Sequence, residues 1–549
     1  MFRMLEDIDP DKIEDPHAKQ CVVTLLNLAE SHFEQIRLLK EQNQLLRDEI
    51  ARLKGQQGKP LVKPNKPAVD HSSEAQRRQP TLWQKRPKRD FLEVTRTCEV
   101  AADRTTLPED AVFKGYEEFT VQDLKLVSET VCFRRAKFYS PSTQKTYLAP
   151  LPEGYDSHFG PNLKSLALWL GYAGNMSQTA IHSLLTCAGV SISTGQVNRL
   201  LVEGQDLFHE ESQEVLLSGL SCAPWANIDD TSTRVNGRNE HCHVLGNPLF
   251  TFYHTAPRKD RQAVLSALCG GADLTYLCNS AALAYMQVQG LGKPDRKRLQ
   301  ELPQDTPMSG EVLLLLLTEF LPDLSSKKIT TIQEGMAIAA YQAQQEFPAL
   351  QLLVCDAAGQ FIWLTYERAL CWIHDGRHYA KLMPRLAPHA KRLTDFQKDY
   401  WDFYKELLVY QQAPTSAEAV RLEEKFDTLF ATVSGYDALD DRIQKTRAHK
   451  DELLMVLLHP EIPLHNNAAE LAARKRVRKR DVSFGPRSEL GKSCWDTFMT
   501  LSATAAKLGV NFYHYLEDRL SEAGEIPSLA SLIRERAEQL NLGASWEAA

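Results

Sequence analysis

No long uninterrupted apolar run occurs in this chain of 549 residues. The longest run, Val312 to Leu317, falls far short of the roughly 20 residues that a membrane-spanning helix needs. The N-terminal residues, Met1 to Asp7, also lack the apolar segment of a secretory signal peptide. We therefore expect a protein of the cytoplasm that makes no contact with a membrane.

Paired cysteines are missing as well. The 11 cysteines are scattered, none of them in a Cys-x-x-Cys pair, so we expect reduced thiols rather than disulfides. Cys371 and His374 have a spacing suitable for two metal ligands, and His241 and His243 would share one face of a strand. Two ligands do not make a zinc site, and the sequence predicts none.

An excess of positive charge is also absent, because the formal net charge is −7. That value alone does not indicate a nucleic-acid-binding protein, yet the charge is unevenly distributed. Residues 1–17 form an acidic leader, whereas residues 55–90 carry nine bases and three acids among five prolines. The second segment is typical of a flexible basic linker. A solvated tether and nonspecific contact with phosphates are equally compatible with it.

A heptad pattern runs through residues 18–54. At a stand Val22, Ala29, Ile36, Asn43 and Ile50, and at d stand Leu25, His32, Leu39, Leu46 and Leu53. β-Branched residues at a with Leu at d favour a parallel two-stranded coiled coil, and Asn43 would fix its register. We therefore predict a homodimer through this segment. The alternative is an amphipathic helix that packs on its own domain.

Two small domains are expected next. Residues 91–150 contain alternating polar and apolar segments, such as Glu129 to Tyr139, and predict a small β-rich domain. Residues 151–220 predict a helical domain in which a turn at Ala188 to Val190 joins two helices, as in a helix-turn-helix unit that binds DNA. The residues of that unit that would face DNA are Gln196, Asn198 and Arg199.

The rest of the sequence predicts an α/β catalytic core at residues 221–520. Segments rich in helix formers interrupt it, and helical insertions are expected at about 271–345 and 380–455. Within the core, the Asn236-Gly237 dipeptide predicts a hairpin turn between two strands. A C-terminal tail would follow at 521–549.

Three acidic residues mark the candidate site of this core. Asp229 lies in an apolar strand, Asp356 follows one, and Glu470 opens a segment with helical preference. Asp230 is a rival of Asp229, because neighbouring residues of a strand point to opposite faces. Mg²⁺ prefers oxygen ligands, and two such ions about 3.5–4 Å apart stabilise the attacking and leaving oxygens of a displacement at phosphorus. The expected cofactor of Asp229, Asp356 and Glu470 is therefore Mg²⁺ or Mn²⁺.

Six cations lie within seven residues, starting one helical turn after Glu470. They are Arg474, Lys475, Arg476, Arg478, Lys479 and Arg480. A solvated helix face is one interpretation of this run. We prefer contact with DNA phosphates, because like charges this dense repel one another unless an anion is present.

The block from His465 to Glu470 is followed by Arg474, Arg480, Phe484, Gly485 and Ser488. This block resembles the C-terminal signature of the IS-sixty-six family of bacterial insertion-sequence transposases. Ile228 to Thr231 looks like the first acidic motif of that family. Leu370 to His374, with Arg377 and Tyr379 after it, is similar to the segment that follows the family's second acid.

The resemblance implies a ribonuclease-H-like core of the DDE type, in which Asp229, Asp356 and Glu470 form the catalytic triad and hold the metals. His374 would lie near the site and contact DNA. The expected activity is cleavage of the element ends and joining of the freed 3′ hydroxyl to target DNA. The implied partners are double-stranded DNA and small accessory proteins of the element, and the implied location is the nucleoid.

The chain departs from the family pattern in several places. His465 stands where the family usually has Asp, and Leu471 where it usually has Arg. A Cys-x-x-Cys zinc-binding segment commonly follows the N-terminal helix in the family, but Cys98 and Cys132 lack such partners. Two alternatives therefore stay open, a catalytically silent DNA-binding protein derived from a transposase and a ribonuclease-H-like nuclease.

Overall fold

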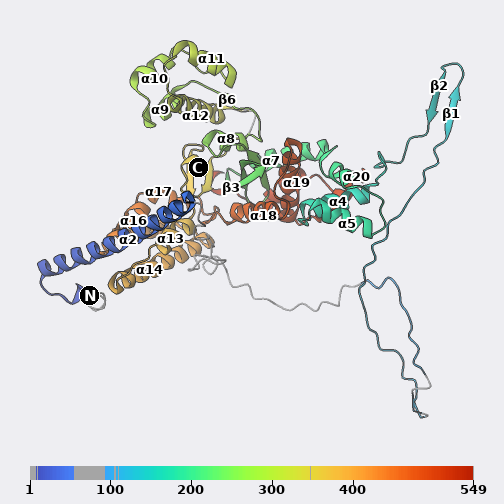
Figure 1. Cartoon of the computed structure of the whole chain (residues 1–549), viewed down its shortest axis with the longest axis horizontal. Coiled ribbons are helices and arrows are strands. Elements are labelled where there is room, and N and C mark those ends of the chain that lie inside the picture. The colour runs from blue at the N-terminus through green and yellow to red at the C-terminus, as the bar shows by residue number, and fades with distance from the viewer. Residues whose placement is uncertain are drawn as a thin grey trace.

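The computed structural model describes residues 8, 10–54, 93–103, 107–108, 110–345 and 348–547 (Figure 1). The predicted basic linker at 55–90 lies outside the described residues, as do residues 1–7 and 9 of the predicted acidic leader. The described chain is a mixed α/β structure in which many helices surround a five-stranded sheet. This agrees with the α/β class expected from the sequence.

The five-stranded sheet has the order β5-β4-β3-β8-β9. Its central strand β3 (Trp225–Val235) pairs antiparallel with β4 (Arg238–Gly246), which pairs antiparallel with β5 (Thr251–Ala256). On its other side β3 pairs in parallel with β8 (Leu352–Cys355), and β8 with β9 (Glu367–Leu370). The sheet is therefore half antiparallel and half parallel, with β3 at the junction.

The predicted hairpin turn joins β3 to β4. Asn236 and Gly237 both have positive φ, 47° and 76°, as a two-residue hairpin loop of this type requires. The sequence predicted one strand after this turn, whereas the structure divides that segment into β4 and β5. The hairpin itself is confirmed.

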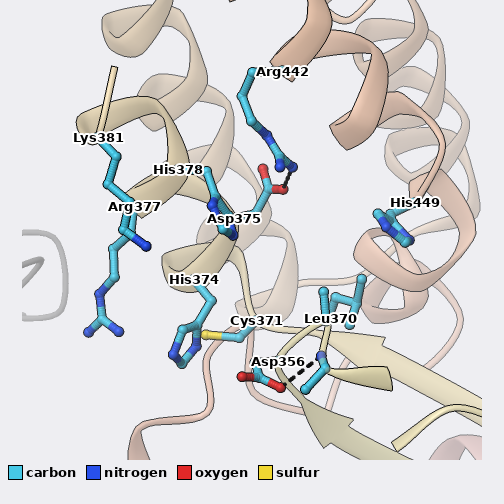
Figure 2. A pocket seen from close by; sticks show the side chains of 12 residues that line it. Asp356, Leu370, Cys371, His374, Asp375, Arg377, His378, Lys381, Arg442 and His449 are labelled. Atoms are coloured by element: carbon cyan, nitrogen blue, oxygen red, sulfur yellow. Dashed lines mark hydrogen bonds and ion pairs between the residues drawn. The ribbon is translucent and has the colours of Figure 1, made fainter. Parts of the chain in front are cut away.

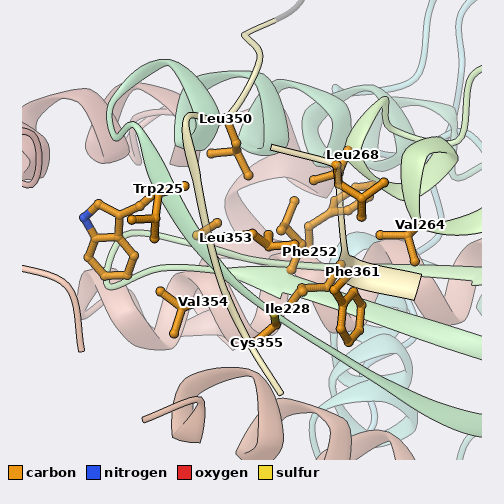
Figure 3. Packing of buried hydrophobic residues seen from close by; sticks show 14 of the residues in the cluster. Trp225, Ile228, Phe252, Val264, Leu268, Leu350, Leu353, Val354, Cys355 and Phe361 are labelled. Carbon is orange, nitrogen blue, oxygen red and sulfur yellow. The ribbon is translucent and has the colours of Figure 1, made fainter. Parts of the chain in front are cut away.

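Helices cover both faces of the sheet. α18 (Asn467–Ser483) and α19 (Glu489–Leu508) pack on one face, where Val244 and Tyr253 are buried against their side chains. α8 (Arg261–Leu268) covers the other face, and Figure 3 shows its Val264 and Leu268 beside Ile228 and Phe252 of the strands. Along β3, β4 and β5, alternate side chains therefore face α18 and α19 on one side of the sheet and α8 on the other.

Two groups of helices interrupt this core, the first within the expected 271–345 and the second beginning at α13, before the expected 380–455. The first contains α9 (Ser280–Val288), α10 (Lys293–Leu299), α11 (Gly310–Phe320) and α12 (Ser326–Ala343), with a short pair of strands, β6 (Thr275–Tyr276) and β7 (Met308–Ser309). In Figure 1 it forms a lobe of its own beyond α8.

The second insertion contains α13 (Trp372–Ala380), α14 (Ala387–Gln412), α15 (Ser416–Leu429), α16 (Asp437–Arg447) and α17 (Lys450–Leu453). Aromatic rings fill its interior, with Trp372 surrounded by Tyr400, Phe403, Phe426 and Phe430. This packing fixes the start of α13, which borders the candidate site.

The segment expected as a C-terminal tail is part of the folded core. α20 (Phe512–Ser521) packs on α4 (Pro161–Tyr172), and α21 (Leu529–Leu540) packs on α7 (Asp206–Ser221). α22 (Ala544–Glu547) follows, and the Trp225 indole N–H donates to the carbonyl of Leu542 at 2.8 Å. The prediction of a tail at 521–549 is wrong, because α21 buries an apolar stripe.

The expected β-rich domain at 91–150 is reduced to one hairpin. Its strands β1 (Lys137–Ser140) and β2 (Lys145–Leu148) pair antiparallel. Their side chains are almost all exposed, and the other described residues between 93 and 150 form no strand. The prediction fails because this alternating pattern has no second layer against which to bury its apolar side.

α2 (Pro16–Leu53) is the helix predicted at 18–54, preceded by η1 (Pro10–Lys12). Its first half packs on its own chain. Leu26 is buried, and the Glu30 carboxylate accepts the backbone N–H groups of Arg385 and Leu386, at 2.6 and 3.2 Å, just before α14. Neither α2 nor another described helix is long and apolar enough to cross a bilayer.

Candidate catalytic site

The two neighbouring aspartates of β3 face different layers. Asp229 is paired with Val244, and paired residues share a face, so its side chain lies on the side of α18. Asp230 points to the other side, where the Lys259 ammonium lies 2.8 Å from its Oδ1 and the Gln360 amide donates to its Oδ2 at 2.8 Å. Asp229 is therefore the aspartate on the side of Glu470.

Asp356 lies beside Asp229 because β3 and β8 are parallel. Asn227 is paired with Val354, so both aspartates come two residues after the last pair of this ladder. Asp356 Oδ1 accepts the backbone N–H of Ala358 at 3.0 Å, which closes the turn after β8. Asp229, in the middle of β3, thus lies beside Asp356, which directly follows the carboxyl end of β8.

Glu470 is held against these strands by the start of α18. The Asn466 side chain donates to the Ile228 carbonyl at 2.6 Å and accepts from the Asn227 amide at 2.9 Å. The Asn466 backbone N–H donates to Cys371 Sγ at 3.2 Å. Asn227 and Asn466 are each only 1% exposed, and neither had a role predicted from the sequence. The sequence feature that could have indicated these roles is the presence of Asn227 in the strand motif and of Asn466 just before the helix that carries Glu470.

The pKa of Asp229 responds to its burial and to the nearby acidic residues. Burial raises the pKa of the Asp229 carboxyl to about 7, opposed by the hydrogen bond from the Asp230 N–H and reinforced by the charges of Asp230, Asp356 and Glu470. A bound cation would favour the ionised form of a carboxyl whose pKa is raised by burial and by neighbouring negative charge. The structure therefore gathers the three sequence-predicted acids into one interacting cluster.

The Glu470 side chain also contacts α13. Arg377 Nη2 lies 3.3 Å from Glu470 Oε2, and His374 Nδ1 lies 3.6 Å from Oε1. Within the described residues, Cys371, His374 and Glu470 are the one group of three His, Cys, Asp or Glu whose ligand atoms all lie within 4.8 Å of one another. The carboxylate oxygens of Asp229, Asp356 and Glu470 are thus farther apart than the ligand atoms of this group.

A cavity of about 500 Å³ opens beside Asp356 (Figure 2). Its wall is rich in cationic and imidazole side chains, which come from α13 and the residue after it, from α16, and from the residue before α17. These are His374, Arg377, His378, Lys381, Arg442 and His449. Arg442 is paired with Asp375, whereas Arg377 and Lys381 extend along the outer side of α13 in Figure 2. Asp356 is the member of the predicted triad that lines this cavity, together with these basic side chains.

The cations of α18 divide between solvent and core. Arg474, Lys475 and Arg478 are exposed, and Arg480 is partly covered and donates to the Ser232 carbonyl at 2.5 Å. Arg476 and Lys479 are only 0% and 3% exposed. The prediction that all six contact DNA is therefore wrong for these two.

Both buried cations have partners inside the protein. The Arg476 guanidinium lies 3.0 Å from Asp496 Oδ1 and donates to Thr255 Oγ1 at 2.8 Å. The Lys479 ammonium lies over the rings of Tyr172 and Trp495 and donates to the Gly171 carbonyl. Burial lowers the pKa of Lys479 to about 7. These side chains fix α18 to its neighbours.

The predicted DNA-reading residues lie on α6 (Thr194–Val202), which follows α5 (Gln178–Cys187). Gln196 accepts the backbone N–H of Ser193 in a capping box at the start of α6. Asn198 accepts from the Gln178 amide at 2.7 Å, and Arg199 is exposed. Gln196 thus has a local structural role, whereas Asn198 and Arg199 stay on the surface.

Comparison with known proteins gives one relative. No family profile matches the chain, and no solved structure matches it. The uncharacterized protein y4jO of Sinorhizobium fredii (strain NBRC 101917 / NGR234) is 31% identical over 330 residues, which span 59% of this chain and 100% of y4jO. The chain therefore belongs to the same protein family as y4jO.

Proposed function

We propose that this chain is a DDE transposase similar to the IS-sixty-six family, which cleaves the ends of an insertion element and joins the freed 3′ hydroxyl to target DNA. The observation that carries the proposal is the convergence of Asp229, Asp356 and Glu470 where β3, β8 and the start of α18 meet. The charges of Asp356 and Glu470 raise the pKa of Asp229 after its burial. Such a cluster is expected at a cation site rather than on a solvated surface.

The architecture around the cluster supports a ribonuclease-H-like core. Three antiparallel strands are followed by two parallel ones, with β3 in the centre. One acid lies on the central strand, one after the adjacent parallel strand, and one on a helix that packs across the sheet. This is the arrangement that the motif resemblance implies.

The donor set fits a hard divalent cation, since carboxylate oxygens are the ligands that Mg²⁺ prefers. Asp229 and Asp356 would hold it from the strands, and Glu470 would complete the set from α18. Bound there, Mg²⁺ or Mn²⁺ supplies charge neutralisation and activation of an oxygen nucleophile at phosphorus. Asn466 positions Glu470, and Arg377 orients its carboxylate.

Basic side chains beside the cluster offer a path for DNA. His378, Lys381 and Arg377 line the cavity next to Asp356, and Arg474, Lys475 and Arg478 project from the helix that carries Glu470. Phosphate contacts by these side chains would position double-stranded DNA without reading its sequence. Element ends and target DNA, a second subunit, small accessory proteins and the nucleoid are the partners and location that belong to this proposal.

The test is strand cleavage and joining on a plasmid that carries the gene with its flanking DNA, incubated with Mg²⁺ or Mn²⁺. We expect metal-dependent nicks at defined flanking positions and joined products, both lost in Asp229→Ala, Asp356→Ala and Glu470→Ala. Asp230→Asn is the matched control, because its side chain lies on the opposite face of β3 and pairs with Lys259.

Other outcomes would favour the other hypotheses. Metal-dependent cutting at random positions would indicate a nuclease. Specific binding to the flanking DNA with no cutting, even with accessory proteins, would indicate a silent DNA-binding protein. Cleavage that survives all three alanine substitutions would remove Asp229, Asp356 and Glu470 from the mechanism.

A further inference from the structure

A second ligand set lies next to the acidic cluster. Cys371 is the residue before α13, and His374 lies in the first turn of that helix, so both side chains gather at one helix end. Glu470 comes from the first turn of α18. Their ligand atoms lie within 4.8 Å of one another, and Figure 2 shows Cys371 and His374 side by side next to Asp356.

The two helix ends are fastened together at this point. The Trp372 N–H donates to the Leu464 carbonyl at 3.0 Å, and the Asn466 N–H donates to Cys371 Sγ at 3.2 Å. The Trp372 indole, fully buried, donates to the Leu453 carbonyl at 2.8 Å. The three ligands therefore stand on a rigid frame, as a preorganised metal site requires.

The chemistry of the set differs from that of the acids. A thiolate, an imidazole and a carboxylate are the ligands of Zn²⁺ and similar softer cations, whereas Mg²⁺ is held by oxygen alone. Cys371 is buried, and burial raises the pKa of its thiol to about 11, although the backbone N–H of Asn466, which donates to Sγ at 3.2 Å, acts in the opposite direction. A cation bound there would therefore have to displace the thiol proton, as metal binding to cysteine generally does.

We propose that Cys371, His374 and Glu470 bind one Zn²⁺ or a cation of similar softness. Three protein ligands leave a fourth position for a water or a substrate oxygen, on the side of the cavity next to Asp356. Glu470 is the third ligand, which the spacing of Cys371 and His374 in the sequence could not indicate. Because Glu470 belongs to both ligand sets, Zn²⁺ would withdraw it from Asp229 and Asp356 and inhibit Mg²⁺-dependent cleavage, a consequence that rests on the proposed function.

Cobalt spectroscopy of the full-length reduced protein tests the site directly, with Co²⁺ as the probe. We expect a sulfur-to-cobalt charge-transfer band that saturates at one equivalent and disappears when Zn²⁺ is added. Cys371→Ser should abolish the band, and His374→Ala and Glu470→Gln should each weaken Co²⁺ binding by at least about tenfold. A variant with the exposed Cys21, Cys98, Cys132 and Cys187 changed to Ser is the control that keeps the band.

The absence of the band, or a band that survives Cys371→Ser, would overturn the proposal. If Cys371→Ser does not fold, His374→Ala decides, because its partly exposed side chain is not part of the core; unchanged Co²⁺ affinity in that variant would also overturn it. In the cleavage assay, the Zn²⁺ concentration that halves the rate should rise at least about tenfold in Cys371→Ser. A wild type that binds Co²⁺ through Cys371 but never cleaves DNA would remove the proposed function and leave the metal site in place.

Discussion

At the scale of single residues, strand geometry separates two identical side chains. Asp229 and Asp230 are adjacent, yet one joins Asp356 and Glu470 while the other pairs with Lys259 and accepts from Gln360. From the sequence both are candidates. The sequence shows that neighbouring residues of a strand point to opposite faces, but it does not show which face carries the site. The packing of α18 on the face that carries Asp229 and Val244 supplies the missing information.

Asp229 should make the stability of the metal-free protein depend on pH. Its pKa is about 7 in the folded state against a usual value of 3.8. The unfolded chain therefore ionises first, and the free energy of unfolding should fall as pH rises from about 4 to 7, by at most roughly 4 kcal/mol. Urea denaturation in EDTA measures this fall.

Asp229→Asn should flatten that dependence, because an amide does not titrate. Mg²⁺ should raise the free energy of unfolding of the wild type near pH 8 more than near pH 5, where protons compete with the cation. A wild-type pH dependence equal to that of Asp229→Asn would contradict the role of burial and like charge at this carboxyl.

Asn466→Ala should destabilise the protein and impair the site together. The substitution leaves the buried Asn227 amide and Ile228 carbonyl without the Asn466 side chain, at about 1–3 kcal/mol for each group. Thermal unfolding measures the loss, and cleavage assays below the melting temperature measure the displacement of Glu470. Leu471→Ala, an exposed change on the same helix, is the control and should alter stability by less than about 0.5 kcal/mol.

At the scale of helices and strands, sequence patterns succeed where they are local. The Asn236-Gly237 turn and the helices of both insertions were predictable, because a dihedral preference or a run of helix formers specifies each. The β-rich domain at 91–150 was not, since the aromatic side chains of its one hairpin, Phe138, Tyr139 and Tyr147, stay exposed. In the same way, the burial of Leu529 and Ile533 was not predictable, because it depends on packing against α7, which is distant in the sequence.

The candidate site was predictable only in part for the same reason. The three acids stand out by their flanking residues, but the contacts of Glu470 with Arg377 and His374 join segments about 95 residues apart in the sequence. The density of cations on α18 predicted a DNA surface. It could not reveal that Asp496 and two aromatic rings bury two of those cations.

The two sides of α18 should respond differently to substitution. Arg474→Gln with Arg478→Gln should lower the slope of log affinity against log salt by about 0.9 for each phosphate that is no longer neutralised, with little change in stability. Arg476→Gln should leave that slope unchanged and destabilise the protein by about 3–5 kcal/mol, because it leaves Asp496 buried without its partner. Fluorescence anisotropy across salt concentrations and urea denaturation separate the two effects, and an unchanged slope in the double variant would place the DNA elsewhere.

At the scale of the whole molecule, α2 runs from the second insertion to an exposed apolar seam. Its first half is fixed to the second insertion through Leu26 and Glu30, and that insertion carries α13 and the cavity. From Glu34 onward the helix is almost entirely exposed, including Ile36, Leu39 and Leu46. The alternative of packing on the chain itself thus holds for the first half, and the coiled coil remains a prediction for the second.

A seam of exposed leucines this long is stabilised when a second copy covers it. Leu39→Lys with Leu46→Lys places charges at two d positions and should give a monomer by sedimentation equilibrium at concentrations where the wild type is a dimer. Gln44→Lys, a neighbouring change outside the seam, should remain dimeric. Because α2 is anchored to the insertion that carries α13, we expect the monomeric variant to lose coupled joining of two ends before it loses nicking of one. A double variant that stays dimeric would place the subunit interface outside α2.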